Sequence, residues 1–354
     1  MKVLMIDSVS DLYGSSRICE LLIKFFVSSG HEVSTLVGRE LRDIKLRYAT
    51  CTDLPVLVFS RFKRNPIKHI FDIILSMKIF FFYLKPKFGD FDLVYCNTVG
   101  TLPCALIAKF FGFKVVLHLH ETASNRSVAF VLRHLMNYLD FIICVSNVVK
   151  ESWSLSGDKI FVVHNGIDKV SVCEFKSKDY DICFVGRLID KKGIRFFLRS
   201  LEAISLTNQR SLKVLIAGGF VRDSSASVKI PTSLNGRIFV DYLGEVEDTS
   251  NVFSRSKVAC VPSLFKDPFP TTVLEGLRAG CTVVATNNGG AAEALKGLST
   301  SYLVPTNDVD ELADALIRAT SEFTELIFRE NIKFFNDNLS LRKFQSEFTG
   351  LPFL

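Results

Sequence analysis

The sequence predicts an α/β fold built from two doubly wound, Rossmann-like domains. Three observations support this prediction: short continuous apolar runs alternate with helix-like patterns, a second such series starts near residue 180, and the chain has 354 residues. Continuous apolar runs are typical of parallel strands buried on both faces. Strands that alternate with helical segments favour parallel sheets, and this length suits two cores better than one.

The first series begins with the apolar run KVLMI at 2–6. A loop containing Gly14 follows, and then a helix pattern that ends at Gly30, as glycine often ends helices. Four more buried runs and a strand with its turn complete the series. We expect these strands at 32–37, 93–97, 114–120, 141–146 and 160–168.

The second series repeats this alternation. We expect strands at 181–186, 213–219, 238–244, 258–263 and 281–286, with helices at 194–204 and 310–320. The stretch at 169–179 has the polarity of a linker. We therefore place the domains at 1–172 and 173–334, and we expect a C-terminal helix at about 335–354 to pack back on the first domain.

Composition indicates a chain that works in the cytoplasm. The hydrophobic fraction of 48% and the charged fraction of 23% are close to those of soluble globular proteins. The nine cysteines form no C-x-x-C pair, and acidic residues interrupt the N-terminus where a signal peptide would be apolar. The most apolar stretch, 67–84, contains Lys68, Asp72 and Lys78, so we do not expect it to span a membrane.

Residues 39–90 are strongly basic, with eleven Lys or Arg against five Asp or Glu. Phe62, Ile67, Phe71 and Ile74 recur at a spacing that suits one helix face. A basic amphipathic helix can lie on anionic lipid headgroups. The alternative is an ordinary solvated face over a core helix. A lipid-binding helix would predict peripheral binding to the inner face of the cytoplasmic membrane. The sequence pattern is compatible with both interpretations.

Five segments at expected strand ends carry glycines or polar side chains. They are YGSSR (13–17), HLHE (118–121), GRLIDKKG (186–193), PSLFKDPFPTTVLEGLRAG (262–280) and NNGGAAEAL (287–295). In this order and spacing they resemble the GT-B glycosyltransferases of family 4, a retaining nucleotide-sugar family, over residues 1 to about 320. The resemblance implies the GT-B architecture, with two Rossmann-like domains that face each other across a cleft.

The basic loop is predicted to bind the donor's phosphates. Arg187 offers a planar fork and Lys192 a point charge, a natural pair for the oxygens of a leaving diphosphate. The resemblance assigns this role to the same two residues. Gly186 and Gly14 are predicted to allow close approach of the backbone to the donor. The alternative is a solvated basic turn, which is how we interpret Lys191.

The resemblance also assigns roles to residues at two other strand ends. His120 is expected to contact the transferred sugar, with His118 on the same strand face as its competitor. Glu275 is expected to accept hydrogen bonds from the ribose diol. Asp267 stands where the family has Glu, and it is expected to contact the sugar hydroxyls. Phe269, Thr271 and Thr272, at the start of the next helix, complete the expected donor site.

We therefore predict a retaining glycosyltransferase that moves a hexose or N-acetylhexosamine from a UDP-sugar to a saccharide or lipid-linked saccharide. The resemblance implies bacterial O-antigen, capsule or exopolysaccharide assembly. Two alternatives remain: a GDP-mannose-dependent enzyme of the same fold, and a non-catalytic sugar-nucleotide-binding scaffold, which Asp267 keeps open. We expect no metal, because Arg187 and Lys192 supply the cations and no D-x-D motif lies at a strand end. No nucleic-acid partner is expected.

Overall fold

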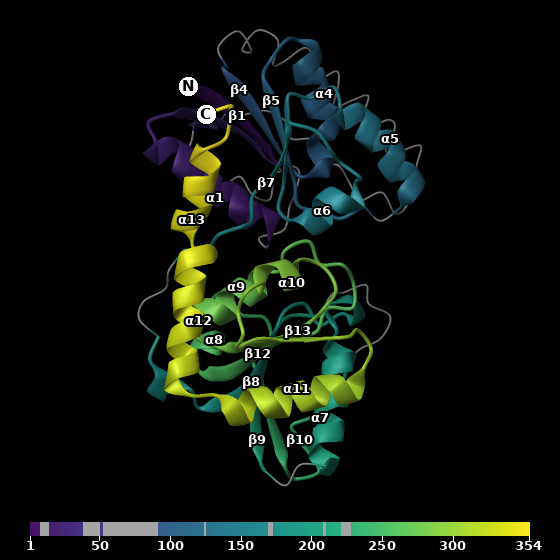
Figure 1. Cartoon of the computed structure of the whole chain (residues 1–354), viewed down its shortest axis with the longest axis vertical. Helices are drawn as coiled ribbons and strands as arrows, with labels where there is room; N and C mark the ends of the chain where they lie inside the picture. Colours follow the sequence, from purple (N-terminus) through teal and green to yellow (C-terminus); the bar gives the residue numbers. More distant parts are fainter. Residues whose placement is uncertain are drawn as a thin grey trace. The chain divides into compact units, whose positions relative to one another are not determined.

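A computed structural model describes the protein at residues 1–7, 14–37, 50–51, 91–123, 125–168, 173–207, 210–220 and 228–354 (Figure 1). The chain divides into two compact units. Unit 1 consists of Met1–Val163 and Gly350–Leu354, and unit 2 consists of His164–Thr349.

Unit 1 is built on a seven-stranded parallel sheet with the order β3-β2-β1-β4-β5-β6-β7. Its strands are β1 (Lys2–Asp7), β2 (Glu32–Val37), β3 (Thr50–Cys51), β4 (Leu93–Asn97), β5 (Val115–Leu119), β6 (Phe141–Cys144) and β7 (Ile160–Val162). The residues of β4 and β5 are all buried, as expected for strands covered on both faces.

The helices of unit 1 cover this sheet. They are α1 (Ser15–Ser28), η4 (Val99–Thr101), α4 (Leu102–Phe110), α5 (Arg126–Met136) and α6 (Asn147–Ser152). Side chains cap two of these helices: Asn125 accepts hydrogen bonds from the N–H groups of Ser127 and Val128 at the start of α5, and Ser146 accepts one from Val149 of α6. In the part of the chain that the structure describes, no helix has the length and apolar character needed to cross a membrane.

Unit 2 contains a second seven-stranded sheet with the order β10-β11-β9-β8-β12-β13-β14. Its strands are β8 (Tyr180–Val185), β9 (Leu212–Ala217), β10 (Ser233–Leu234), β11 (Ile238–Tyr242), β12 (Ser256–Val261), β13 (Thr282–Thr286) and β14 (Tyr302–Val304). The edge strand β10 runs antiparallel to β11, and the other described pairs are parallel.

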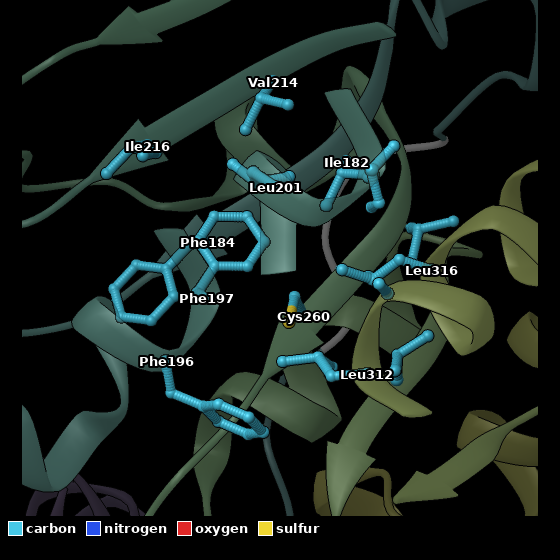
Figure 2. Packing of buried hydrophobic residues seen from close by; sticks show 14 of the residues in the cluster. Ile182, Phe184, Phe196, Phe197, Leu201, Val214, Ile216, Cys260, Leu312 and Leu316 are labelled. Atoms are coloured by element: carbon cyan, nitrogen blue, oxygen red, sulfur yellow. The ribbon is translucent and has the colours of Figure 1, made fainter. Parts of the chain in front are cut away.

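The helices of unit 2 are η5 (Phe175–Ser177), η6 (Asp190–Lys192), α7 (Ile194–Thr207), α8 (Ser250–Ser254), α9 (Thr271–Arg278), α10 (Gly290–Ala294), α11 (Val309–Glu322), α12 (Glu325–Asn338) and α13 (Leu341–Thr349). Figure 2 shows the core under β8, where α7 and α11 meet the sheet. Phe184 of β8 stacks on Phe197 of α7 with 5.5 Å between ring centroids, and Leu316 of α11 is fully buried in the same cluster.

Both sheets share one topology, which decides where a ligand can bind. In each unit the first strand lies at the centre. In unit 1, β2 and β3 lie on one side of β1 and the later strands on the other; in unit 2, β9, β11 and the antiparallel edge strand β10 lie on one side of β8 and the later strands on the other. The strand order therefore reverses between β1 and β4 in unit 1, and between β8 and β12 in unit 2. In open α/β sheets, ligands bind outside the carboxyl ends of the strands at such a switch point.

The structure confirms the α/β fold with two Rossmann-like, mainly parallel domains. The strands expected from the apolar runs all occur, with bounds that differ by a few residues. The strands β3, β10 and β14 were not predicted, because each has only two or three residues at or near a sheet edge. The segment 39–90, apart from Thr50 and Cys51, lies outside the described residues, so its predicted membrane helix stays a prediction.

The division between the units differs from the one placed at residue 172. The chain divides after Val163, and α12 and α13 belong to unit 2. The reason is a bridge within unit 2, where Ile167 pairs with Ser340 and the peptide of Gly166 lies against it. Only the last five residues join unit 1, where the Phe353 ring lies 5.3 Å from that of Phe141.

Candidate functional site

The loop that follows β8 is held tightly against the end of β12. Gly193 has a φ of +80°, and a Cβ atom there would lie 1.9 Å from the carbonyl oxygen of Pro262. The Lys191 carbonyl accepts a 2.9 Å hydrogen bond from the Leu264 N–H. Glycine is therefore required at position 193, since any side chain would push the loop away from the switch point. The loop is a fixed part of the sheet end.

Within this loop, Lys192 forms an ion pair with Asp267, 75 residues further along the chain. Its Nζ lies 2.7 Å from Asp267 Oδ2, and the two side chains are 25% and 10% exposed. The Phe265 ring centroid lies 5.3 Å from the same ammonium group, and the Ser263 hydroxyl is 3.4 Å from the carboxylate. The structure thus brings together two residues that the sequence assigned to different parts of the donor, phosphate and sugar.

The other two cations of the loop are exposed. Arg187 is exposed, and its guanidinium makes no hydrogen bond or ion pair with the residues that the structure describes. Gly186, before it, has a φ of +152° and donates its N–H to the Ala217 carbonyl at 3.0 Å. The Gly186 N–H is therefore already hydrogen-bonded to the end of β9. Gly186 shapes the loop, while Arg187 presents the charge.

The loops after β12 and β13 are tied together at Asp267. The Gly290 N–H donates to the Asp267 carbonyl at 2.7 Å, and Gly289 forms an isolated parallel bridge with Asp267. A Cβ at Gly290 would lie 2.0 Å from the Pro268 carbonyl oxygen. The paired glycines of the fifth motif therefore permit close contact between two loops, and this contact fixes the backbone of Asp267.

The helix α9 starts at Thr271, as expected from the proline before it. Pro270 is the N-cap residue, and no side chain caps the helix. The N–H groups in the first turn of a helix lack intrahelical partners and carry its positive end. Thr271 and Thr272 are both half-buried. Donors from their backbone thus lie only four residues beyond the Asp267 carboxylate in the chain.

One turn into α9, Glu275 is 4% exposed. Its Oε2 accepts a 2.9 Å hydrogen bond from the Thr249 hydroxyl. Sequence reasoning missed Thr249, which precedes a short helix and carries no motif. A carboxylate held in this way keeps acceptor capacity for a diol.

The side chain of Phe269 has a structural neighbour that its sequence does not reveal. Its ring, 4% exposed, stacks on the His164 imidazole with 4.8 Å between centroids and an angle of 7°. His164 Nε2 lies 3.0 Å from Glu293 Oε2. The predicted donor contact by Phe269 stays a prediction, while the ring itself buttresses the loop before α9.

In unit 1, His120 follows β5 and hydrogen-bonds to the end of the neighbouring strand β4, beside the switch point. Its Nε2 is 2.8 Å from Asn97 Oδ1, and the ring is 9% exposed. Burial lowers the pKa of His120 to about 4, although the Asp7 carboxylate opposes this shift. The imidazole is therefore neutral at physiological pH and acts as a hydrogen-bonding group.

His118 occupies the interior behind it. Its ring centroid lies 4.1 Å from that of His120, and its Nδ1 is 2.8 Å from the Tyr95 hydroxyl. Full burial lowers the pKa of His118 well below its usual value. Its Nε2 has no hydrogen-bond partner among the described residues. Of the two histidines, His120 is thus the one nearer to solvent.

Glu121 is the last residue of the HLHE motif, and the sequence alone predicts no role for it. Its Oε2 accepts hydrogen bonds from the backbone N–H groups of Val99 and His120, both at 3.2 Å. The Trp153 indole donates to its carbonyl at 2.7 Å. Burial raises the pKa of Glu121 to about 7. Glu121 therefore joins the loop after β4 to the backbone of His120. The signal in the sequence that could have indicated this role is an acidic residue directly after the expected strand.

Gly14 precedes α1 with a φ of +66°, and a Cβ there would meet nothing within 4 Å. Gly14 itself is exposed. The neighbouring Ser15 carbonyl accepts a 3.3 Å hydrogen bond from Asn97 Nδ2, the residue that also contacts His120. The ends of β1, β4 and β5 thus meet in one polar cluster.

Among the described residues, no group of three or more His, Cys, Asp or Glu side chains is arranged to hold a metal ion. Among the described residues after β8, Arg187 and Lys191 are exposed, positively charged and without a carboxylate partner. They suit an anionic ligand such as a phosphate.

Two family models match the chain, one on each half. Residues 13–170 match the model described as glycosyltransferase family 4, and residues 179–322 match that of glycosyl transferases group 1. Together they cover most of the chain and include each of the predicted site residues.

Individual proteins agree with these models. The chain is 26% identical to an uncharacterised glycosyltransferase of Methanocaldococcus jannaschii, over 89% of this chain and 86% of that protein. It is 24% identical to the UDP-Gal:α-D-GlcNAc-diphosphoundecaprenol α-1,3-galactosyltransferase of Escherichia coli, over 71% and 72%. The crystal structure of Anabaena HepE in complex with UDP shares the fold, with a TM-score of 0.76 and 16% identity over 99% and 98% of the two chains.

Proposed function

This chain belongs to family 4 of the GT-B glycosyltransferases, and we propose that it transfers a hexose or N-acetylhexosamine from a UDP-sugar with retention of configuration. The observation that carries this proposal is the Lys192–Asp267 ion pair beside Arg187 at the switch point of unit 2. It combines a cation for phosphate with a carboxylate for sugar hydroxyls. A simple solvated turn would not bury Asp267 to this extent.

In the proposed complex, Arg187 and Lys192 bind the donor diphosphate, and the first-turn N–H groups of α9 add hydrogen bonds to it. Glu275 accepts the ribose hydroxyls, and its bond from Thr249 orients the carboxylate. Asp267 then contacts both Lys192 and a hydroxyl of the transferred sugar. Charge-assisted hydrogen bonds of this kind are about twice as strong as neutral ones.

The transfer step follows from these contacts. The acceptor hydroxyl oxygen forms a bond to the anomeric carbon, on the face from which the diphosphate departs. The bond between that carbon and the bridging phosphate oxygen breaks, and its electron pair stays on the diphosphate. The acceptor's proton goes to a departing phosphate oxygen. Arg187 and Lys192 stabilise the charge that develops there, which is the largest catalytic contribution expected of such a site.

The proposal also covers the role of His120 and the absence of a metal requirement. Because its pKa is lowered to about 4, His120 is neutral and hydrogen-bonds the transferred sugar. It does not act as a charged acid. The two side-chain cations take the place that a divalent ion has in other transferases, so we propose a metal-independent reaction.

We propose a saccharide acceptor on a lipid carrier, used in bacterial O-antigen, capsule or exopolysaccharide assembly. Two relatives support this choice, since the E. coli galactosyltransferase and a Campylobacter jejuni N-acetylgalactosaminyltransferase, 24% identical over 76% of this chain, are both named for undecaprenol-linked acceptors. Such an acceptor places the reaction at the inner face of the cytoplasmic membrane.

The test is a thermal-shift screen of the full chain with UDP, GDP and their sugars, followed by a transfer assay. A nucleotide present at 100 times its Kd adds about 2.7 kcal/mol to the free energy of unfolding. We expect UDP and a UDP-sugar to raise Tm, and the product to keep the donor's anomeric configuration by NMR. Stabilisation by GDP alone would favour a GDP-mannose-dependent enzyme, and nucleotide binding without transfer or donor hydrolysis would favour a scaffold.

A further inference from the structure

The outward side of α5 is unusually apolar. The helix buries Ala129 and Met136 against unit 1. On its other side Val128, Val131 and Leu135 follow at i, i+3 and i+7, a spacing that aligns them along one face. We define the α5 patch as these three residues together with Phe130, which lies beside Arg133, and Tyr138, two residues after the end of the helix. Their exposed fractions are 49% (Val128), 58% (Phe130), 58% (Val131), 37% (Leu135) and 71% (Tyr138).

This concentration distinguishes α5 from every other described helix. The exposed large apolar residues on the remaining helices occur singly, as Val27 on α1, Phe110 on α4, Leu206 on α7 and Leu326 on α12. Single exposed apolar residues are normal, whereas a contiguous group marks a surface that contacts something apolar. Figure 1 shows α5 at the outer edge of unit 1, next to α4.

The charges around the patch indicate what covers it. Residues 122–139 contain Arg126, Arg133 and His134 but no Asp or Glu. The Arg133 guanidinium lies 5.3 Å from the Phe130 ring centroid, so a cation borders the apolar surface. The next acidic residue, Asp140, is already paired with Lys109 at 2.5 Å. The segment that carries the patch is therefore positively charged and complements an anionic partner. The nearest described acidic side chain on the neighbouring α6 segment is the exposed Glu151, three residues before Ser154, whose carbonyl accepts a 3.4 Å hydrogen bond from Arg133.

We propose that the α5 patch lies in the headgroup region of an anionic lipid bilayer. A helix with an apolar face, cationic flanks and no acidic residue has the composition of an interfacial helix. The Val128–Val131–Leu135 face enters the boundary between headgroups and acyl chains, while Arg126 and Arg133 contact lipid phosphates. The inference rests on the proposed function in one respect: a lipid-linked acceptor requires the enzyme to work at such a surface.

The test is co-sedimentation of the full chain with vesicles of phosphatidylcholine, with and without phosphatidylglycerol. We expect Val131→Glu/Leu135→Glu to lower the partition coefficient on anionic vesicles about tenfold or more, because two apolar side chains leave the interface. Arg126→Gln lowers it about fivefold, an effect that high salt removes. The variants Val131→Ser/Leu135→Ser repeat the first change without added charge, and circular dichroism checks that each variant is folded.

The matched control is Leu206→Glu/Leu326→Glu, which changes two comparably exposed residues, 69% and 75%, on helices of unit 2. Binding through other surfaces, the basic segment 39–90 included, stays the same in both double variants. The difference between them therefore isolates the α5 patch. Equal vesicle binding by both, or equal binding to vesicles with and without phosphatidylglycerol, overturns the proposal.

Two further outcomes keep the inference separate from the function. If the wild-type chain is a dimer that Val131→Glu/Leu135→Glu converts to a monomer without loss of vesicle binding, the patch is a protein interface and the lipid proposal is wrong. Transfer to a water-soluble acceptor is measured in parallel. Its absence in the wild-type chain contradicts the proposed function and leaves the vesicle result to be judged alone.

Discussion

The two sheets reverse their strand order in the same way, but their carboxyl ends differ in electrostatic character. In unit 1 the groups beside the switch point include the uncharged Asn97 and two titratable side chains, His120 and Glu121, whose neutral forms are favoured by burial. In unit 2 the switch point carries the cations Arg187 and Lys192. The Asp267 carboxylate, from the loop after β12, pairs with Lys192. The same strand order therefore supports two kinds of chemistry, because the loops and not the sheet decide which groups are presented.

The proposed function gives the two kinds of group different tasks. A group held neutral, such as the His120 imidazole, can exchange hydrogen bonds with hydroxyls without stabilising a charge. Fixed cations do the opposite, since they act most strongly on charge that develops in the transition state. The predictions below alter one side of this comparison at a time, from the largest expected effect to the smallest.

Removing a cation from unit 2 should have the largest effect. We expect Arg187→Ala and Lys192→Ala each to lower kcat about 10²–10³-fold, the scale of losing one preorganised donor. Lys191→Ala, which leaves the backbone contact to Leu264 in place, should be close to wild type. Steady-state kinetics decide between them, and a Lys191 variant more damaged than the Lys192 variant contradicts the assignment within the loop.

Asp267 should affect turnover and not the binding of free nucleotide. We expect Asp267→Asn to lower kcat about 10- to 100-fold, because a charged hydrogen bond to the sugar is lost. UDP affinity should hold or rise, since Asp267 competes with phosphate for Lys192. Asp267→Glu, which restores the family's longer side chain, should retain more activity. A tenfold weakening of UDP binding by Asp267→Asn contradicts the division between phosphate and sugar contacts.

In unit 1, Glu121 should make stability depend on pH. Because its folded pKa is about 7 and its ordinary value 4.5, the folded chain holds a proton that the unfolded chain releases between these values. Its contribution is therefore present below pH 4.5 and lost as pH rises through 7. Relative to wild type, Glu121→Gln should be unchanged near pH 4.5 and more stable by up to about 3 kcal/mol above pH 7.

Thermal unfolding at several pH values measures this difference. The exposed Glu151→Gln on α6 is the control and should show no such trend. If the Glu121 variant differs from wild type by the same amount at every pH, the pKa of Glu121 is the same in the folded and unfolded chains. The carboxyl is then ionised at neutral pH, and unit 1 lacks the neutral character described above.

Removal of metal should have the smallest effect. Because Arg187 and Lys192 supply the positive charge, activity should survive EDTA at close to its full rate. Complete loss on chelation, with rescue by Mn²⁺, would show that the cations of unit 2 do not suffice.

Most of the fold was predictable because its strands are long, apolar and bounded by glycine or polar residues. The boundary between the two units was not predictable from the sequence, because it depends on the long-range bridge between Ile167 and Ser340. The short strands β10 and β14 carry too few residues for a periodic signal.

For the site, sequence placed Arg187, Lys192 and Asp267 at strand ends but not in contact with one another. The Lys192–Asp267 pair joins loops 75 residues apart, and only the fold brings them together. The same holds for the stacking of Phe269 on His164 and for the Thr249 hydroxyl on Glu275. The raised pKa of Glu121 arises from burial, which no local pattern reports.

The most direct test of the central claim, that the nucleotide binds at the switch point of unit 2, is calorimetry of UDP with the full chain and Glu275→Ala. Loss of a charged hydrogen bond to the ribose costs about 1.5–3 kcal/mol, so the account predicts a UDP Kd about 10- to 100-fold higher than that of wild type. Thr249→Val, which removes only the orienting hydroxyl, should have a smaller effect in the same direction. An unchanged Kd for a folded Glu275→Ala variant would contradict the account.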